Sequence, residues 1–155
     1  MKEEIRGRAR ELGFDDCRFT TAERPVFGAK FQQWLEEGFH GRMEYLARNA
    51  EKRRDPEKVL AGAKSVISLA TSYYGGEESE PEAREGVVAR YARYADYHKV
   101  IGERLEKLTE FINGLTEVRA RSLWYVDTGP ILERDFAQRA GLGYRTGDPV
   151  LLSQR

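Results

Sequence analysis

The stretch VRARSLWYVDTGPILERDFAQRA, residues 118–140, decides the fold class, because its pattern changes from that of a strand to that of a helix. Its first part, residues 118–126, is rich in large apolar side chains and predicts a buried strand that ends at the turn DTGP. Residues 131–140 then predict a helix, which Gly141 terminates. A strand followed closely by a helix is typical of α/β proteins, in which helices cover a sheet.

The rest of the chain continues this mixed order. Helices are predicted for residues 2–12, 29–37, 43–50 and 97–113. Strands are predicted for residues 14–20, 65–73 and 87–91. The long helix at 97–113 has the clearest pattern, since its apolar residues repeat at helical spacing on one face. Between residues 75 and 86 the chain is charged and glycine-rich, which predicts a solvated loop. We therefore expect an α/β fold with a mixed sheet covered by helices.

Composition limits the classes of protein that the chain can form. The 155 residues include 26 Lys and Arg and 26 Asp and Glu, so the net charge is zero and no whole-chain signal for nucleic-acid binding exists. The single cysteine, Cys17, excludes an internal disulfide and a cysteine-ligated zinc or iron–sulfur site built by this chain alone. The longest uncharged run is too short to cross a bilayer. We expect one domain, residues 1–155, in a cytoplasmic protein without a membrane partner.

Asp127 is the first candidate for a chemical role. It follows the predicted strand directly and precedes the predicted helix, and ligand crevices of α/β sheets lie at such strand ends. A carboxyl group at this position could serve as a general acid. The structural alternative is a turn aspartate that only accepts hydrogen bonds from neighbouring backbone amides. Position alone favours the structural interpretation.

Two other places concentrate polar and aromatic side chains. Asp96, Tyr97 and His98 could grip a polar ligand, or Asp96 could simply cap the long helix. His40 lies between two predicted helices, where a lone histidine is more often structural. With only two histidines in the chain, a site of several histidine ligands is excluded, and we expect no metal site. Basic residues that could neutralise phosphates, or only form a solvated face, are Arg48, Lys52, Arg53, Arg54, Arg119 and Arg121.

Several segments, in this order along the chain, resemble one known family. They are FHGRMEYL (39–46), RRDP (53–56), GAKSVIS (62–68), RYA (90–92), DYH (96–98), VDTGPILER (126–134) and AGLG (140–143). The ordered set is similar to the N-terminal domain of epoxyqueuosine reductase, the cobalamin-dependent enzyme of queuosine biosynthesis in tRNA. The resemblance covers residues 1–150 and is much more specific than any one of its motifs.

The resemblance carries expectations that the residues alone do not. It implies a fold related to the cobalamin-binding nitroreductase-like and reductive dehalogenase domains. It also implies that cobalamin lies over the modified nucleoside in a tRNA anticodon loop. Asp127 matches the aspartate that donates a proton, and the family likeness places Arg53, Tyr97, His98 and Thr128 in or near the cobalamin pocket. In the family, a following ferredoxin-like domain with two [4Fe–4S] clusters delivers the electrons.

Two functional interpretations follow. In the first, the chain is the N-terminal domain of an epoxyqueuosine reductase-like oxidoreductase that acts in tRNA modification. It lacks the iron–sulfur domain, so its electrons come from a separate ferredoxin-type donor. In the second, it is a truncated module that binds a corrinoid or a nucleoside without turnover, or a remnant of only structural value. The second interpretation draws on the run at residues 143–148, where tyrosine and aspartate replace the tryptophan and lysine usual in the family.

Overall fold

The computed structural model describes residues 1–74, 86, 88–115, 117, 120–145 and 151–153. The chain divides into two compact units. The first comprises Met1–Asp15 and Thr71–Val126, and the second comprises Asp16–Ala70 and Asp127–Arg155. We describe each unit by itself. The expected single-domain organisation stays a prediction.

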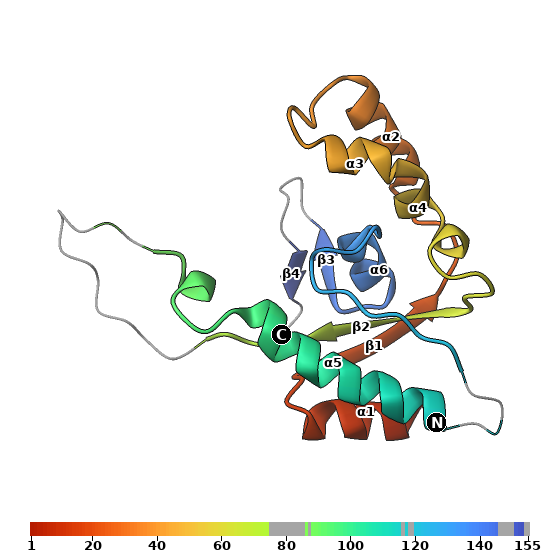
Figure 1. The fold of residues 1–155 in the computed structure, drawn as a ribbon, viewed down its shortest axis with the longest axis vertical. Helices are drawn as coiled ribbons and strands as arrows, with labels where there is room; N and C mark the ends of the chain where they lie inside the picture. The colour runs from red at the N-terminus through yellow and green to blue at the C-terminus, as the bar shows by residue number, and fades with distance from the viewer. Residues whose placement is uncertain (75–85, 87, 116, 118–119, 146–150, 154–155) are drawn as a thin grey trace. The chain divides into compact units, whose positions relative to one another are not determined.

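In the first unit, helix α1 (Lys2–Glu11) lies beside helix α5 (Tyr97–Gly114), as Figure 1 shows. The two helices bury Ile5 and Ala9 of α1 and Leu105 and Leu108 of α5, which lie at the helical spacing that the sequence displays. Both predicted helices are therefore confirmed to within two residues. A short 3-10 helix, η2 (Arg90–Ala92), precedes α5 along the chain.

After α1 the chain turns at Gly13, in a backbone conformation that glycine adopts more easily than other residues. Gly13 has a φ of +87°, a left-handed conformation that is strained for residues with a side chain. Its carbonyl oxygen accepts a hydrogen bond of 2.9 Å from Nη1 of Arg104 on α5. The end of α1 is thus tied to the middle of α5.

In the second unit, strands β1 (Asp16–Thr21) and β2 (Ser65–Ala70) form an antiparallel pair in which Cys17 lies opposite Leu69. Helix α6 (Glu133–Arg139) packs against both strands and buries Phe136, which is 1% exposed. Strands β3 (Gly143–Arg145) and β4 (Leu151–Ser153) form a second antiparallel pair (Figure 1). The α/β class is confirmed, with small antiparallel sheets in the described residues in place of the expected mixed sheet.

Between β1 and β2 the second unit carries a helical segment. It consists of α2 (Gly28–Glu36), α3 (Glu44–Arg48), α4 (Ala50–Arg54) and the 3-10 helix η1 (Pro56–Lys58). The single helix predicted for 43–50 is wrong in its extent, because the chain leaves helical geometry at Asn49, whose φ is −109°. Helix α2 packs against α4.

Two predicted strands are wrong. Residues 120–126 form no strand, and neither do residues 88 and 89, which precede η2. The expected burial is also wrong in part, because Leu123 and Trp124 are exposed by 48% and 42%. A Cβ atom added to Gly102 of α5 would lie 3.3 Å from the ring of Trp124, so this ring rests against the helix where glycine leaves room. The predicted loop at 75–86 falls, except for Gly86, outside the described residues, as do residues 146–148 of the altered run.

None of the helices in the described part of the chain is long and apolar enough to cross a membrane.

Candidate functional site

The turn that begins at Asp127 has an unusual backbone. Asp127 has a φ of +57°, which makes it the one residue other than glycine with a positive φ among the described residues. Left-handed geometry costs a residue with a Cβ roughly 1–2 kcal/mol, although aspartate tolerates it better than most. The side chains of Asp127 and Thr128 are exposed, whereas Gly129 is buried. Residues 127–132, here called the Asp127 turn, therefore present a carboxyl group to solvent from a conformation that its neighbours must stabilise.

Arg53 of α4 anchors the far half of this turn. Its Nη1 donates to the carbonyl oxygens of Gly129 at 3.2 Å and of Ile131 at 3.3 Å. Its Nε is buried, and no group in the described residues accepts a hydrogen bond from it. Arg53 thus holds the turn that carries Asp127, the other predicted site residue, through hydrogen bonds to backbone carbonyl oxygens.

Glu133, the first residue of α6, follows the Asp127 turn directly along the chain. Its carboxyl group is close enough to Asp127 for the two negative charges to interact. Burial raises the pKa of Glu133 to about 7, and the negative charge of Asp127 adds to this effect, while Arg53 and Arg134 oppose it. Its Oε1 is buried and has no hydrogen-bond partner in the described part of the chain. The site thus contains a second carboxyl group that titrates near neutral pH.

Helix α6 is fixed to the rest of its unit by two polar residues. Asp135, 2% exposed, accepts hydrogen bonds from the backbone N–H groups of Val26 at 3.2 Å and Phe27 at 2.7 Å. At the other end, Arg139 donates to Oγ1 of Thr21 at 2.8 Å and to the carbonyl oxygen of Glu23 at 3.0 Å. Glu133 therefore stands on a firmly held helix.

Sequence reasoning missed Glu133 and Asp135 as site and support residues. Both were visible only as two acidic residues in the first turn of a predicted helix, where acids are common because they complement the helix dipole. The one further signal was that Glu133 belongs to the VDTGPILER segment on which the family likeness rests.

Tyr97 and His98 form an aromatic group at the start of α5, in the first unit. Their ring centroids are 4.1 Å apart and the ring planes differ by 28°, and Tyr91 meets Tyr97 edge-on at 6.3 Å. Asp96 accepts hydrogen bonds of 3.0 Å from both the backbone N–H and Nδ1 of His98. These bonds, the backbone one foremost, hold the pKa of Asp96 below its usual value. Asp96 thus caps the N-terminus of α5, as predicted. That Tyr97 and His98 lie in one pocket with Arg53 and Asp127 stays a prediction.

The remaining candidates have mainly structural surroundings. His40 lies beside Trp34, with ring centroids 6.2 Å apart, in the turn between α2 and α3. In the basic segment, Arg48 and Lys52 are exposed, whereas Arg53 is half-buried and engaged with the Asp127 turn. The described residues contain no group of three or more His, Cys, Asp or Glu side chains arranged to hold a metal ion.

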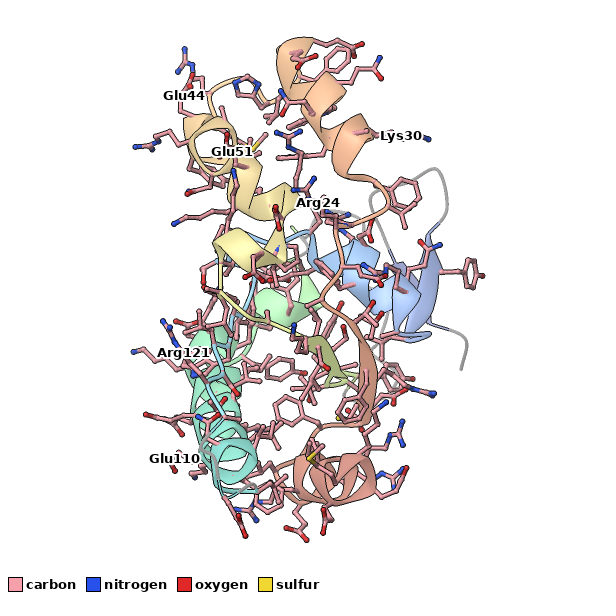
Figure 2. All side chains as sticks on the ribbon, turned by 90° about the vertical axis from the view of Figure 1, so that its right-hand side faces the viewer. Arg24, Lys30, Glu44, Glu51, Glu110 and Arg121 are labelled. Atoms are coloured by element: carbon pink, nitrogen blue, oxygen red, sulfur yellow. The ribbon has the colours of Figure 1, made fainter. Side chains whose placement is uncertain are left out.

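A hollow of about 260 Å³ lies beside α4 and η1. Its charged lining residues include Arg24, Glu51, Asp55 and Lys58, of which Figure 2 labels the first two. Arg24 donates to Asp55 at 2.8 Å and holds the pKa of that carboxyl below its usual value. The Lys58 ammonium likewise lowers the pKa of Glu51. These four charges form two ion pairs, and Arg54 adds a further positive charge to the lining of the hollow.

A family model that matches part of the chain and relatives that match nearly all of it identify the same family. The family model described as "Epoxyqueuosine reductase QueG, DUF1730" matches residues 53–128, from Arg53 into the Asp127 turn. The epoxyqueuosine reductase of Leadbetterella byssophila is 39% identical over 98% of this chain and 50% of its own length. That of Cyclobacterium marinum is 35% identical over 97% of this chain and 48% of its own length. The chain thus spans about half the length of these relatives.

Solved structures agree with the sequence matches. An epoxyqueuosine reductase crystallised with an epoxyqueuosine-modified stem loop of tyrosine tRNA aligns with a TM-score of 0.75 and 32% identity, over 92% of this chain and 38% of that one. The Bacillus subtilis enzyme, described with its catalytic aspartate loop swung out of the active site, aligns with a TM-score of 0.73 and 30% identity, over 92% and 38% of the two chains.

Fold and sequence together make this chain similar to one α/β segment of reductases that are at least twice its length. Within that class, the chain belongs to the epoxyqueuosine reductase family.

Proposed function

We propose that this chain supplies the substrate-handling part of an epoxyqueuosine reductase, which converts epoxyqueuosine in tRNA to queuosine. The observation that carries the proposal is the Asp127 turn, in which an exposed aspartate with a left-handed backbone begins a turn whose carbonyl oxygens at Gly129 and Ile131 are bound by Arg53. The family match across nearly the whole chain supports the same substrate.

The reaction defines what Asp127 has to do. Removal of the epoxide oxygen breaks two C–O bonds, forms a C=C bond and releases water, so the overall change consumes two electrons and two protons. An alkoxide is a poor leaving group, and a positioned acid that protonates the oxygen as the C–O bond breaks accelerates such steps by roughly 10²–10⁴-fold. Asp127, exposed at the tip of a fixed turn, is the group in this site that we assign to donate that proton.

The residues of the site fit cobalamin in their chemistry. The stacked Tyr97 and His98 rings offer a flat surface of the kind that packs against a macrocycle, and the Nε of Arg53 is a buried donor without a partner in the described residues. We propose that Arg53, Tyr97, His98 and Thr128 hold cobalamin. When bound and reduced, cobalamin supplies the electrons for the reaction.

The substrate nucleoside reaches the site as part of a tRNA anticodon loop. The complex of a relative with a modified tRNA stem loop supports this partner. Because the chain has zero net charge, we assign the phosphate contacts to the exposed Arg48 and Lys52, which lie on α3 and α4. The electrons come from a ferredoxin-type donor, since the 155 residues contain one cysteine and a [4Fe–4S] cluster normally takes four. We place the reaction in the cytoplasm.

The proposal is tested in two stages. The chain is first titrated with cobalamin and the absorption spectrum is recorded, and saturable binding with a spectral change is expected. An epoxyqueuosine-modified stem loop and excess chemical reductant are then added, and queuosine is measured by mass spectrometry. Saturable binding without any conversion would favour the alternative, a corrinoid- or nucleoside-binding module without turnover. Absence of cobalamin binding at tens of micromolar would contradict the cofactor assignment.

A further inference from the structure

The hollow beside α4 and η1 is lined by three basic side chains that come from three places in the second unit. Arg24 precedes α2, Arg54 is the last residue of α4, and Lys58 is the last residue of η1. The two carboxylates of the lining, Asp55 and Glu51, are paired with Arg24 and Lys58 (Figure 2 labels Arg24 and Glu51). Three cations against two carboxylates leave one positive charge in excess, and the cation without a carboxylate partner among the described residues is Arg54.

Arg54 has a guanidinium donor that the protein does not satisfy. Its Nε is buried and has no acceptor in the part of the chain that the structure describes. A Cβ atom added to Gly28 would lie 3.5 Å from Cγ of Arg54, so the stem of this side chain rests against the start of α2. Because buried polar groups nearly always have hydrogen-bond partners, a packed arginine without an acceptor indicates a ligand that supplies one.

The start of α2 adds backbone donors to the same hollow. Gly28 and Ala29, the first two residues of this nine-residue helix, belong to the lining. No side chain caps the helix, and its first turn contains no acidic residue. Asp135 accepts the N–H groups of Val26 and Phe27, which precede the helix, and the N–H of Ala29 has no acceptor among the described residues. The first amides of a helix carry partial positive charge and favour anions.

We propose that this hollow binds a phosphate group, which accepts hydrogen bonds from the guanidinium of Arg54 and from the start of α2, with Arg24 and Lys58 at its rim. A guanidinium presents its donors in a planar fork that matches the oxygen atoms of phosphate. The volume of about 260 Å³ is smaller than the roughly 300–1,000 Å³ of sites for whole organic ligands, and it suits one phosphate group. Two sources share this chemistry, inorganic phosphate and a phosphodiester of an RNA backbone. The Asp127 turn contributes none of the lining residues, so the inference goes beyond the proposed function.

Inorganic phosphate is the first probe, added to the full chain at constant ionic strength with chloride as the balancing anion. The NMR amide signals of Gly28 and Ala29 should shift saturably in the wild type. Arg54→Gln removes the unpaired guanidinium and should weaken phosphate binding about tenfold or more, because a hydrogen bond to a charged group is lost. Arg121→Gln, which removes an exposed arginine of the first unit, should bind phosphate like the wild type (Figure 2). Equal affinity of Arg54→Gln and the wild type, or no saturable shift in the wild type, would overturn the proposal.

A variant that gains affinity separates binding from a defect in folding. Glu51→Gln removes the exposed carboxylate that pairs with Lys58, so the excess positive charge of the lining rises from one to two. Phosphate should then bind about threefold more tightly, a change typical of one exposed ion pair. A misfolded variant would not show this gain. Unchanged or weaker binding by Glu51→Gln would contradict the electrostatic basis of the site.

An RNA stem loop without terminal phosphates distinguishes the two sources. If the RNA backbone supplies the phosphate, Arg54→Gln should weaken stem-loop binding about tenfold relative to Arg121→Gln, and inorganic phosphate should compete with the stem loop in the wild type. If Arg54→Gln loses inorganic phosphate but keeps the wild-type affinity for the stem loop, the site takes free phosphate and the RNA backbone is excluded. These measurements follow binding alone, so they decide the phosphate site whether or not the chain converts epoxyqueuosine.

Discussion

Nη1 of Arg53 donates to the carbonyl oxygen of Gly129 at 3.2 Å, across 76 positions of the sequence. This contact joins the start of the RRDP segment to the DTGP turn, two segments that are weak motifs when each is taken alone. It explains why an arginine at this position is not simply one of several basic surface residues. Its guanidinium is used to shape the turn that presents Asp127.

The stability of the protein should depend on the protonation of Glu133. Its pKa rises from 4.5 to about 7 on folding, so the folded state binds the proton more tightly. The stabilisation from this group is complete below about pH 4.5 and is lost as the pH rises through about 7, and it amounts to at most about 3 kcal/mol. Denaturant unfolding of the wild type and Glu133→Gln from pH 5 to 8 measures it. As the pH rises, the wild type should lose unfolding free energy relative to Glu133→Gln.

The exposed Glu110 of α5 offers the matched control for that titration, and Figure 2 labels its position. Glu110→Gln removes a carboxylate that is already solvated, so its unfolding free energy should follow that of the wild type over the same pH range. A pH-independent difference between the wild type and Glu133→Gln would contradict the assignment of this titration to Glu133.

Asp135 should be the most sensitive polar residue of the second unit to truncation. Asp135→Ala leaves the backbone N–H groups of Val26 and Phe27 without their acceptor, a side chain that is 2% exposed. The expected loss is about 3 kcal/mol of unfolding free energy, because losing a hydrogen bond to a charged acceptor costs roughly 1.5–3 kcal/mol. Asp135→Asn keeps one acceptor oxygen and should lose less. Equal losses for the two variants in urea unfolding would show that the hydrogen bonds are not the cause.

Binding to the tRNA stem loop should depend on salt through exposed cations. Replacing both Arg48 and Lys52 with glutamine is expected to lower the slope of log K against log salt concentration by about 0.7–0.9 for each phosphate contact removed. Lys30→Gln is the control for the loss of a surface cation elsewhere, because Lys30 on α2 points away from the side on which Glu44 and Glu51 of α3 and α4 lie (Figure 2). A double variant with the wild-type slope would exclude Arg48 and Lys52 as phosphate contacts.

Much of the fold could be predicted from local patterns. Apolar spacing and glycine stops located α1, α5 and α6, and Gly13 and Gly141 both have the positive φ that a helix terminus favours. The segment 120–126 was predicted wrongly because its large apolar residues are typical of a buried strand, whereas Leu123 and Trp124 are exposed. Trp124 is placed against α5, and no neighbouring strand pairs with it in the described residues.

The site could be predicted only in part. Asp127 was found because it stands at the boundary between two patterns, and Arg53 because of the family likeness. The contacts that join them could not be predicted, since Arg53 and Gly129 meet only through tertiary packing. The same holds for Asp135, whose partners lie more than a hundred residues away, at Val26 and Phe27. The pKa of Glu133 depends on burial, which one acidic residue in a helical pattern does not reveal.

The central claim is that Asp127 donates a proton to the departing epoxide oxygen, and single-turnover conversion tests it most directly. The chain is loaded with cobalamin and an epoxyqueuosine-modified stem loop, excess chemical reductant is added, and the rate of queuosine formation is compared between the wild type, Asp127→Asn and Glu110→Gln. Asp127→Asn keeps the shape of the side chain without its acidic proton. It should lose roughly 100-fold or more in rate, with cobalamin affinity nearly unchanged and Glu110→Gln at the wild-type rate. Equal rates for the wild type and Asp127→Asn would contradict the claim and leave Asp127 as a residue of the turn alone.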